Sequence, residues 1–166
     1  MRLDDLNALD GESAMRELLR CCGSTRWARL MAAARPFADA AATGTVADAI
    51  WWSLAPADWL EAFAAHPKIG DRPTSAWATA EQSGSQTAAD DVRQRLAARN
   101  RDYEARFGYI FIVCATGKTA GEMLDLLERR LPNDSDEELR VAAEEQRQIT
   151  RLRLAKLVET EQVTRT

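Results

Sequence analysis

Apolar residues along this chain recur mainly three and four positions apart, which is the spacing of an amphipathic helix. The segment from Gly11 to Cys22 shows the pattern, with apolar side chains at Ala14, Met15, Leu18, Leu19 and Cys22. Alanine and leucine, which favour helices, number 30 and 17, whereas valine and isoleucine, which favour strands, total 11. With 166 residues and no internal repeat or linker, the chain suits one domain. We therefore predict an all-α fold, a single-domain bundle of about eight helices over residues 1–166.

Local signals predict where these helices begin and end. The residue before a proline avoids the helical region, so one helix should end before Pro36 and another before His66-Pro67. Capping-box spacing in Thr119-x-x-Glu122 and in Ser135-x-x-Glu138 predicts the start of the last two helices. The remaining helices are expected at about 11–22, 27–34, 46–54, 57–65, 75–83 and 87–107.

The stretch from Tyr109 to Ala115 departs from the helical pattern. Its seven residues are all apolar, three of them are isoleucine or valine, and glycines at 108 and 117 flank it. It is too short for an average helix, and no second strand is evident for it to pair with. We predict an extended segment that passes irregularly among the helices. Its simplest role is in the core, although a buried irregular backbone also offers N–H and C=O groups that a polar heterocycle could bind.

Charge and cysteine content indicate the class of protein. The net charge of −4 gives no electrostatic reason to expect nucleic acid or an anionic membrane as a partner. The first residues lack the apolar core of a signal peptide, and no run of about 18 apolar residues occurs. Cys21, Cys22 and Cys114 have neither disulfide-framework nor zinc-knuckle spacing, and the apolar neighbours of Cys114 favour a packing role. We expect a cytoplasmic protein.

His66 is the only histidine in the chain. One histidine excludes a multi-histidine metal centre but leaves a single acid or base possible, because imidazole titrates near neutral pH. His66 lies where a helix should stop, between an apolar helix and a loop held by Pro67 and Gly70. It is therefore either a proton donor or acceptor held at a rigid position, or a capping residue with no chemical role.

Two further charged residues are candidates. Glu81, followed by Gln82, lies on the predicted helix 75–83 among few other charges, so its carboxylate either faces solvent or accepts N–H groups of a cyclic urea. Arg153 falls in line with Ile149 and Leu157 on the inward side of the last helix. A cation there needs a partner, which is either a core carboxylate or a bound anion such as a substrate carboxylate.

Five motifs follow one another over nearly the whole chain in a characteristic order. They are His66-Pro67-x-Ile69-Gly70, Ala80-Glu81-Gln82-Ser83-Gly84, Tyr103-x-x-Arg106-Phe107-Gly108-Tyr109-x-Phe111-x-x-Cys114-Ala115, Arg130-Leu131-x-Asn133 and Ile149-x-x-Leu152-Arg153-Leu154-x-x-Leu157. Together they resemble the 2-oxo-4-hydroxy-4-carboxy-5-ureidoimidazoline (OHCU) decarboxylases of urate breakdown.

The resemblance implies an all-helical homodimer that uses neither a metal nor an organic cofactor. The implied reaction removes CO2 from a small ureidoimidazoline and yields (S)-allantoin. By the same resemblance, His66 would donate the proton, Glu81 would hold the ring N–H groups, and Arg153 would bind oxygens of the substrate. The implied pocket is lined by Pro67, Ala78, Gln82 and the backbone of Phe111, Ile112, Val113, Cys114 and Ala115.

One position departs from the family pattern. The family commonly has a serine one helical turn before the Glu81-Gln82 pair, where this chain has Ala78. A hydroxyl contact to substrate would then come from Thr79, Ser75 or water. The alternative to an enzyme is a helical interaction module without catalysis, whose five tryptophans and acidic surface bind a partner.

Overall fold

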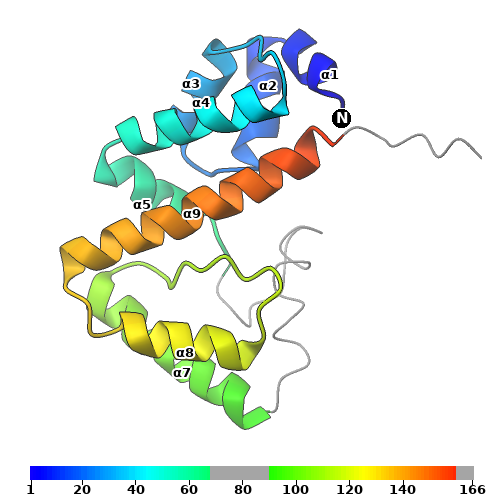
Figure 1. Cartoon of the computed structure of the whole chain (residues 1–166). Helices are drawn as coiled ribbons and strands as arrows, with labels where there is room; N and C mark the ends of the chain where they lie inside the picture. Colours follow the sequence, from blue (N-terminus) through cyan, green and yellow to red (C-terminus); the bar gives the residue numbers. More distant parts are fainter. Residues whose placement is uncertain (68–89, 160–166) are drawn as a thin grey trace, which may run out of the picture. The chain divides into compact units, whose positions relative to one another are not determined.

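The computed structural model describes residues 1–67 and 90–159 (Figure 1). These residues form eight helices and, over the same ranges, no strand, so the predicted all-α class is confirmed. The chain divides into two compact units, Met1–Ala62 with the chain from Arg147 onward, and Phe63–Gln146. The single domain expected over residues 1–166 stays a prediction.

The first unit contains four complete helices: α1 (Leu3–Ala8), α2 (Gly11–Leu19), α3 (Thr25–Ala33) and α4 (Ala40–Ser53). It also holds most of α5 (Pro56–Ala64) and the second half of α9 (Ser135–Leu157). Its core is apolar, and the indole N–H groups of two tryptophans are satisfied by backbone carbonyls. Trp27 donates to the carbonyl of Ala47 at 3.2 Å, and Trp59 donates to that of Trp51 at 2.9 Å.

The second unit is built on α7 (Asp90–Phe107) and α8 (Ala120–Arg130), which pack side by side, and on the first half of α9 (Figure 1). Tyr103, Phe111, Val113 and Leu127 belong to its core cluster. Residues 109–115 form neither helix nor strand, as predicted. Gly108 and Gly117, on either side of them, have φ of +83° and +77°, a left-handed conformation that only glycine adopts without strain. These two glycines thus permit the chain to leave α7 and to enter α8.

The predicted helix ends are partly confirmed. α5 ends at Ala64, before His66-Pro67, and Thr119 caps α8 by accepting the N–H of Glu122 at 3.1 Å. The helix predicted at 46–54 begins earlier, at Ala40, because the carboxylate of Asp39 caps it. Helix α1 was not predicted from the sequence. The helix expected at 75–83 lies outside the described residues.

The capping box expected at Ser135 is wrong by one position. The cap of α9 is Asp134, whose Oδ1 accepts the N–H of Glu137 at 2.9 Å. Glu138, expected to reach back to the start of its own helix, is instead fully buried against the side chain of Arg130. The carboxylate prefers this position because a guanidinium offers it a charged partner that a backbone N–H does not.

Candidate functional site

His66 lies just beyond the end of α5, in the second unit. Its backbone N–H donates to the carbonyl of Phe63 at 3.2 Å, and Pro67 prevents the helix from continuing. The ring is half-buried, and its Nε2 lies 2.5 Å from Oε1 of Gln146 on α9. Gln146 is fully buried. The imidazole is therefore held at both its backbone and its ring, which is what a proton donor with a fixed direction requires.

The extended segment is fixed by cationic side chains that bind its carbonyls. Arg130 Nη1 donates to the carbonyl of Ile112 at 2.7 Å, and Lys118 Nζ donates to that of Cys114, also at 2.7 Å. Glu145 on α9 accepts the backbone N–H of Cys114. Burial raises the pKa of this carboxyl, and the bond from Cys114 lowers it by less. Side chains thus replace the missing partner strand for this buried backbone.

Behind the segment lies a buried charged cluster of four side chains, Arg130, Glu138, Tyr103 and Asn133. Glu138 Oε1 accepts from Arg130 Nε at 2.8 Å and from the hydroxyl of Tyr103 at 2.5 Å, while Oε2 accepts from Asn133 Nδ2 at 3.1 Å. The guanidinium also lies 4.5 Å from the ring centre of Phe111. Burial, and next the bond to Glu138, raise the pKa of the Tyr103 hydroxyl, so it remains a donor. No sequence pattern predicted this cluster, although Arg130 and Asn133 stand in one of the five motifs.

Arg153 lies in the first unit, on the second half of α9, and is half-buried. It is close to the adjacent thiols of Cys21 and Cys22, whose pKa values its charge lowers. Burial outweighs that effect and raises the pKa to about 12 for Cys21 and to about 11 for Cys22. Both cysteines therefore stay protonated and unreactive near neutral pH, which suits packing rather than nucleophilic chemistry.

The predicted site residues are only partly within the described chain. His66, Pro67 and the segment from Phe111 to Ala115 belong to the second unit, whereas Arg153 belongs to the first. Ala78, Glu81 and Gln82 lie outside the described residues. Within residues 1–67 and 90–159, no group of three or more histidine, cysteine or acidic side chains could hold a metal. Over the same ranges, no helix is long and apolar enough to cross a membrane.

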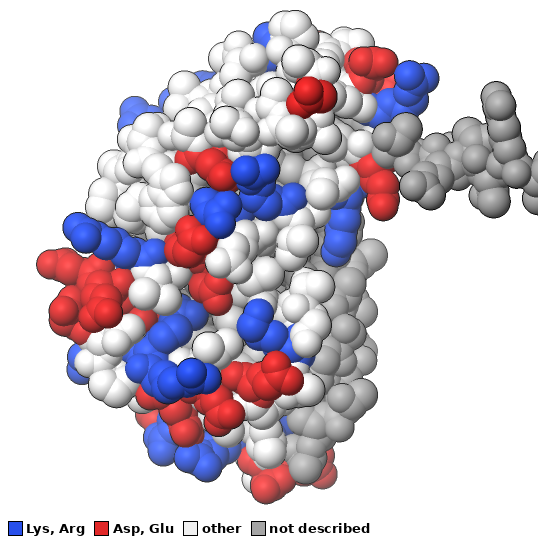
Figure 2. All heavy atoms as spheres, viewed as in Figure 1, with Lys and Arg blue, Asp and Glu red and all other residues white. Residues whose placement is uncertain are grey.

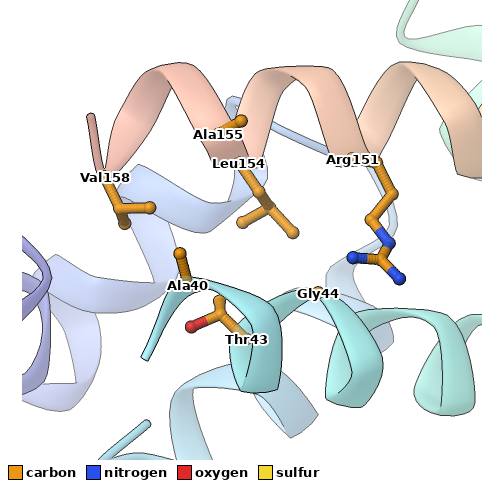
Figure 3. A pocket seen from close by; sticks show the side chains of 7 residues that line it. All are labelled: Ala40, Thr43, Gly44, Arg151, Leu154, Ala155 and Val158. Atoms are coloured by element: carbon orange, nitrogen blue, oxygen red, sulfur yellow. The ribbon is translucent and has the colours of Figure 1, made fainter. Parts of the chain in front are cut away.

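The first unit also contains a small hollow between α4 and α9, which Figure 3 shows from close by. Its volume is about 80 Å³, and it is lined by Ala40, Thr43, Gly44, Arg151, Leu154, Ala155 and Val158. Ligand sites usually measure roughly 300–1,000 Å³, and no predicted site residue lines this one. The guanidinium of Arg151 lies against Gly44, where an added Cβ would come within 1.8 Å of its Nη1. The glycine makes room for Arg151 to reach Asp48 at 2.9 Å.

The face of the molecule in Figure 2 carries both signs of charge, with Lys and Arg interspersed among Asp and Glu. This mixture agrees with the 22 basic and 26 acidic residues of the sequence. The face therefore presents no extended region of one sign.

Comparison with known proteins identifies the family. The sequence model described as OHCU decarboxylase matches residues 7–155. The chain belongs to the OHCU decarboxylase family. Among solved structures, it is similar to an OHCU decarboxylase crystallised in the presence of (S)-allantoin, with a TM-score of 0.79 and 41% sequence identity. That match covers 87% of this chain and 98% of the other.

Curated relatives agree with this OHCU decarboxylase assignment. The chain is 42% identical over 146 residues to the uric acid degradation bifunctional protein TTL of Arabidopsis thaliana. The aligned region covers 82% of this chain and 45% of that protein. It is 34% identical over 101 residues to an OHCU decarboxylase of Amia calva, covering 57% of this chain and 58% of that one. The chain thus spans about half the length of these two relatives.

Proposed function

We propose that this protein converts 2-oxo-4-hydroxy-4-carboxy-5-ureidoimidazoline to (S)-allantoin and CO2, without a metal or an organic cofactor. The observation that carries the proposal is the family match over residues 7–155, which includes the rigidly held His66. The similar solved structure, whose crystals contained (S)-allantoin, supports the same product.

In the proposed reaction the bond between ring carbon 4 and the carboxylate breaks, and CO2 leaves. The electron pair of that bond forms a double bond to ring carbon 5, whose C=N bond takes up the charge on its nitrogen, so that the hydroxyl on carbon 4 becomes an enol. His66 then delivers a proton to one face of carbon 5, which bears the ureido group, and the enol hydroxyl becomes the carbonyl of allantoin as its proton passes to the ring nitrogen; the face of protonation sets the (S) configuration. An acid with a pKa near the working pH serves best here, and His66 is the only side chain of the sequence whose ordinary pKa lies there.

The other roles follow from the family resemblance. Glu81 accepts the N–H groups of the five-membered ring, and Arg153 binds oxygens of the substrate through its forked guanidinium. The remaining contacts are proposed for Pro67, Ala78, Gln82 and the backbone of Phe111, Ile112, Val113, Cys114 and Ala115. Within this set, the backbone of residues 111–115 is held in place by Arg130, Lys118 and Glu145.

The reaction can be tested with substrate generated in place. Urate is treated with urate oxidase and the subsequent hydrolase, and the optical activity of allantoin is followed by circular dichroism with and without this protein. We expect faster formation of allantoin and an excess of the (S) form. If neither appears, the decarboxylase is excluded and the helical interaction module is the remaining candidate.

Within this assay, His66→Ala should abolish most of the acceleration, by about 100-fold or more, because general acid catalysis contributes factors of that order. The helical circular dichroism spectrum should not change. A variant that keeps its rate would show that His66 has no chemical role, and a large loss of helicity would favour a capping role at the end of α5.

Arg153→Met should raise KM more than it lowers kcat, because the guanidinium is proposed to bind substrate before and during the reaction. Arg151→Met, two positions along the same helix, is the matched control, since Arg151 is bound to Asp48. If Arg153→Met has the kinetics of the unchanged protein, Arg153 does not bind substrate and has a structural role.

We further propose a cytoplasmic homodimer. All three cysteines lie within the described residues and form no disulfide there, which suits a reducing compartment. Sedimentation equilibrium would measure the mass of the assembly, and a mass of 18.5 kDa at micromolar concentration would contradict the dimer. Fractionation of the native host cells would test the compartment.

A further inference from the structure

The contact that holds the ring of His66 comes from Gln146, a residue with no role so far in the choice of tautomer. This side chain is fully buried on α9, in the same unit as His66, although its neighbours Ala142 and Ala143 on the helix are apolar. Its Oε1 lies 2.5 Å from Nε2 of the imidazole. A buried amide is costly unless its polar atoms are bonded, so this glutamine is held where its oxygen meets the histidine.

The chemistry of the two groups determines the direction of this bond. An amide oxygen has no hydrogen to give and can only accept. The imidazole must therefore donate, and its Nε2 carries the hydrogen. The same holds when the ring is cationic, because both nitrogens then carry hydrogen. Nε2 is thus protonated in both states, and the proton that the ring gains and loses is the one on Nδ1.

We propose that Gln146 is a positioning residue that holds His66 in the Nε2–H tautomer, so that His66 exchanges its reactive proton through Nδ1. The claim that the reactive proton moves through Nδ1 rests on the proposed decarboxylase function. The claim that the neutral ring carries its hydrogen on Nε2 does not, because it follows from the contact with Gln146 alone.

A neutral acceptor suits this task better than a carboxylate. A carboxylate at hydrogen-bond distance would stabilise the imidazolium and oppose release of its proton. An amide orients the ring equally well and adds no charge. The adjacent carboxylate on the helix, Glu145, is directed elsewhere, since it accepts the backbone N–H of Cys114. The order Glu145-Gln146 thus provides a carboxylate for the extended segment and a neutral acceptor for the histidine.

The presence of a single histidine makes the tautomer directly measurable. In protein labelled with 15N, long-range 1H–15N correlation spectra report the ring nitrogens of His66 without any assignment. Above the titration midpoint, we expect one neutral species with hydrogen on Nε2. A neutral species with hydrogen on Nδ1 would overturn the proposal, because the amide would then have to be donating its N–H.

Variants separate this role from simple packing. Gln146→Leu, similar in size but without an acceptor, should give a mixture of both tautomers, whereas Gln146→Glu keeps the acceptor and should keep the Nε2–H form. Gln148→Leu is the matched control, because Gln148 is two positions from Gln146 on α9 and faces a direction about 200° away around the helix axis. This variant should leave the His66 spectrum unchanged. A Gln146→Leu spectrum identical to that of the unchanged protein would also overturn the proposal. If Gln146→Leu does not fold, the unchanged protein and Gln146→Glu still decide the tautomer.

In the allantoin assay, Gln146→Leu should lower kcat by about 10–100-fold, the loss seen when a metal-binding histidine loses the hydrogen-bond partner that orients it. KM should change little, because the substrate contacts remain. Equal kcat for Gln146→Leu and Gln148→Leu would contradict the positioning role. If the unchanged protein has no decarboxylase activity, the proposed function fails, while the spectra still decide whether Gln146 sets the tautomer.

Discussion

The two units each contain an arginine paired with a carboxylate, but the two pairs differ in burial. Side chains of Arg130 and Glu138 in the second unit are 9% and 0% exposed, with Nη2 and Oε1 2.6 Å apart. Those of Arg151 and Asp48 in the first unit are 40% and 25% exposed, with Nη2 and Oδ2 2.9 Å apart. The distances are similar, so the surroundings and not the geometry distinguish the pairs.

Burial also changes what each pair does for its neighbours. Arg130 and Glu138 bind the carbonyl of Ile112, the hydroxyl of Tyr103 and the amide of Asn133, groups that water would otherwise have to satisfy. Asp48 binds Arg151 and also lies 3.3 Å from Arg147, and solvent reaches all three side chains. The buried pair therefore shapes the extended segment, whereas the exposed pair joins α4 to α9 where solvent reaches both side chains.

The largest effect is expected from removing one member of the buried pair. Glu138→Leu should lower the free energy of unfolding by about 3–5 kcal/mol, because it leaves the guanidinium of Arg130 buried without its counter-charge. Urea denaturation followed by circular dichroism measures the change. The double variant Arg130→Met with Glu138→Leu should recover much of the loss. A cost below about 1 kcal/mol for Glu138→Leu would show that water reaches the pair, and the contrast between the units would disappear.

A smaller effect is expected from the exposed pair. Asp48→Asn should cost about 0.5–1 kcal/mol, since partly exposed ion pairs contribute little and are screened by salt. Between about 0.05 M and about 1 M NaCl the Debye length falls from more than about 10 Å to about 3 Å, so the cost of Asp48→Asn measured by urea denaturation should shrink over this range. The cost of Glu138→Leu should not depend on salt. An Asp48→Asn variant as costly as Glu138→Leu would break the comparison.

The smallest effect concerns Glu145, a half-buried carboxylate of the second unit. Burial raises its pKa above the ordinary value of 4.5, so the folded protein holds the proton more tightly than the unfolded chain does. The protein therefore loses stability as the pH rises from the pKa of Glu145 in the unfolded chain through its higher pKa in the folded protein. At a pH below both pKa values, Glu145 is protonated in both states and has no effect on stability. Glu145→Gln should raise the melting temperature slightly at pH 7 and leave it unchanged at pH 4. A lower melting temperature at pH 7 would show that the charged form is the stabilising one.

Local signals in the sequence predicted most of the helices and the extended segment. The glycines at 108 and 117 were expected to bound that segment, and both have positive φ. The end of α5 before His66-Pro67 was predicted equally well, because a proline restricts the residue before it regardless of the rest of the fold. The start of α4 was misplaced, since a capping aspartate, Asp39, can extend a helix into residues with no apolar stripe.

The helical class, the irregular passage of residues 109–115, the place of the single histidine after a helix and the family could all be predicted from the sequence. All of these depend on neighbours within a few residues or on the order of motifs along the chain. Three features depend on long-range packing: the inward turn of Glu138 to Arg130, the contact of Gln146 with His66, and the electrostatic effect of Arg153 on Cys21 and Cys22. The reason is physical: His66 and Gln146 are 80 positions apart, and a contact over that distance depends on packing that no local spacing encodes.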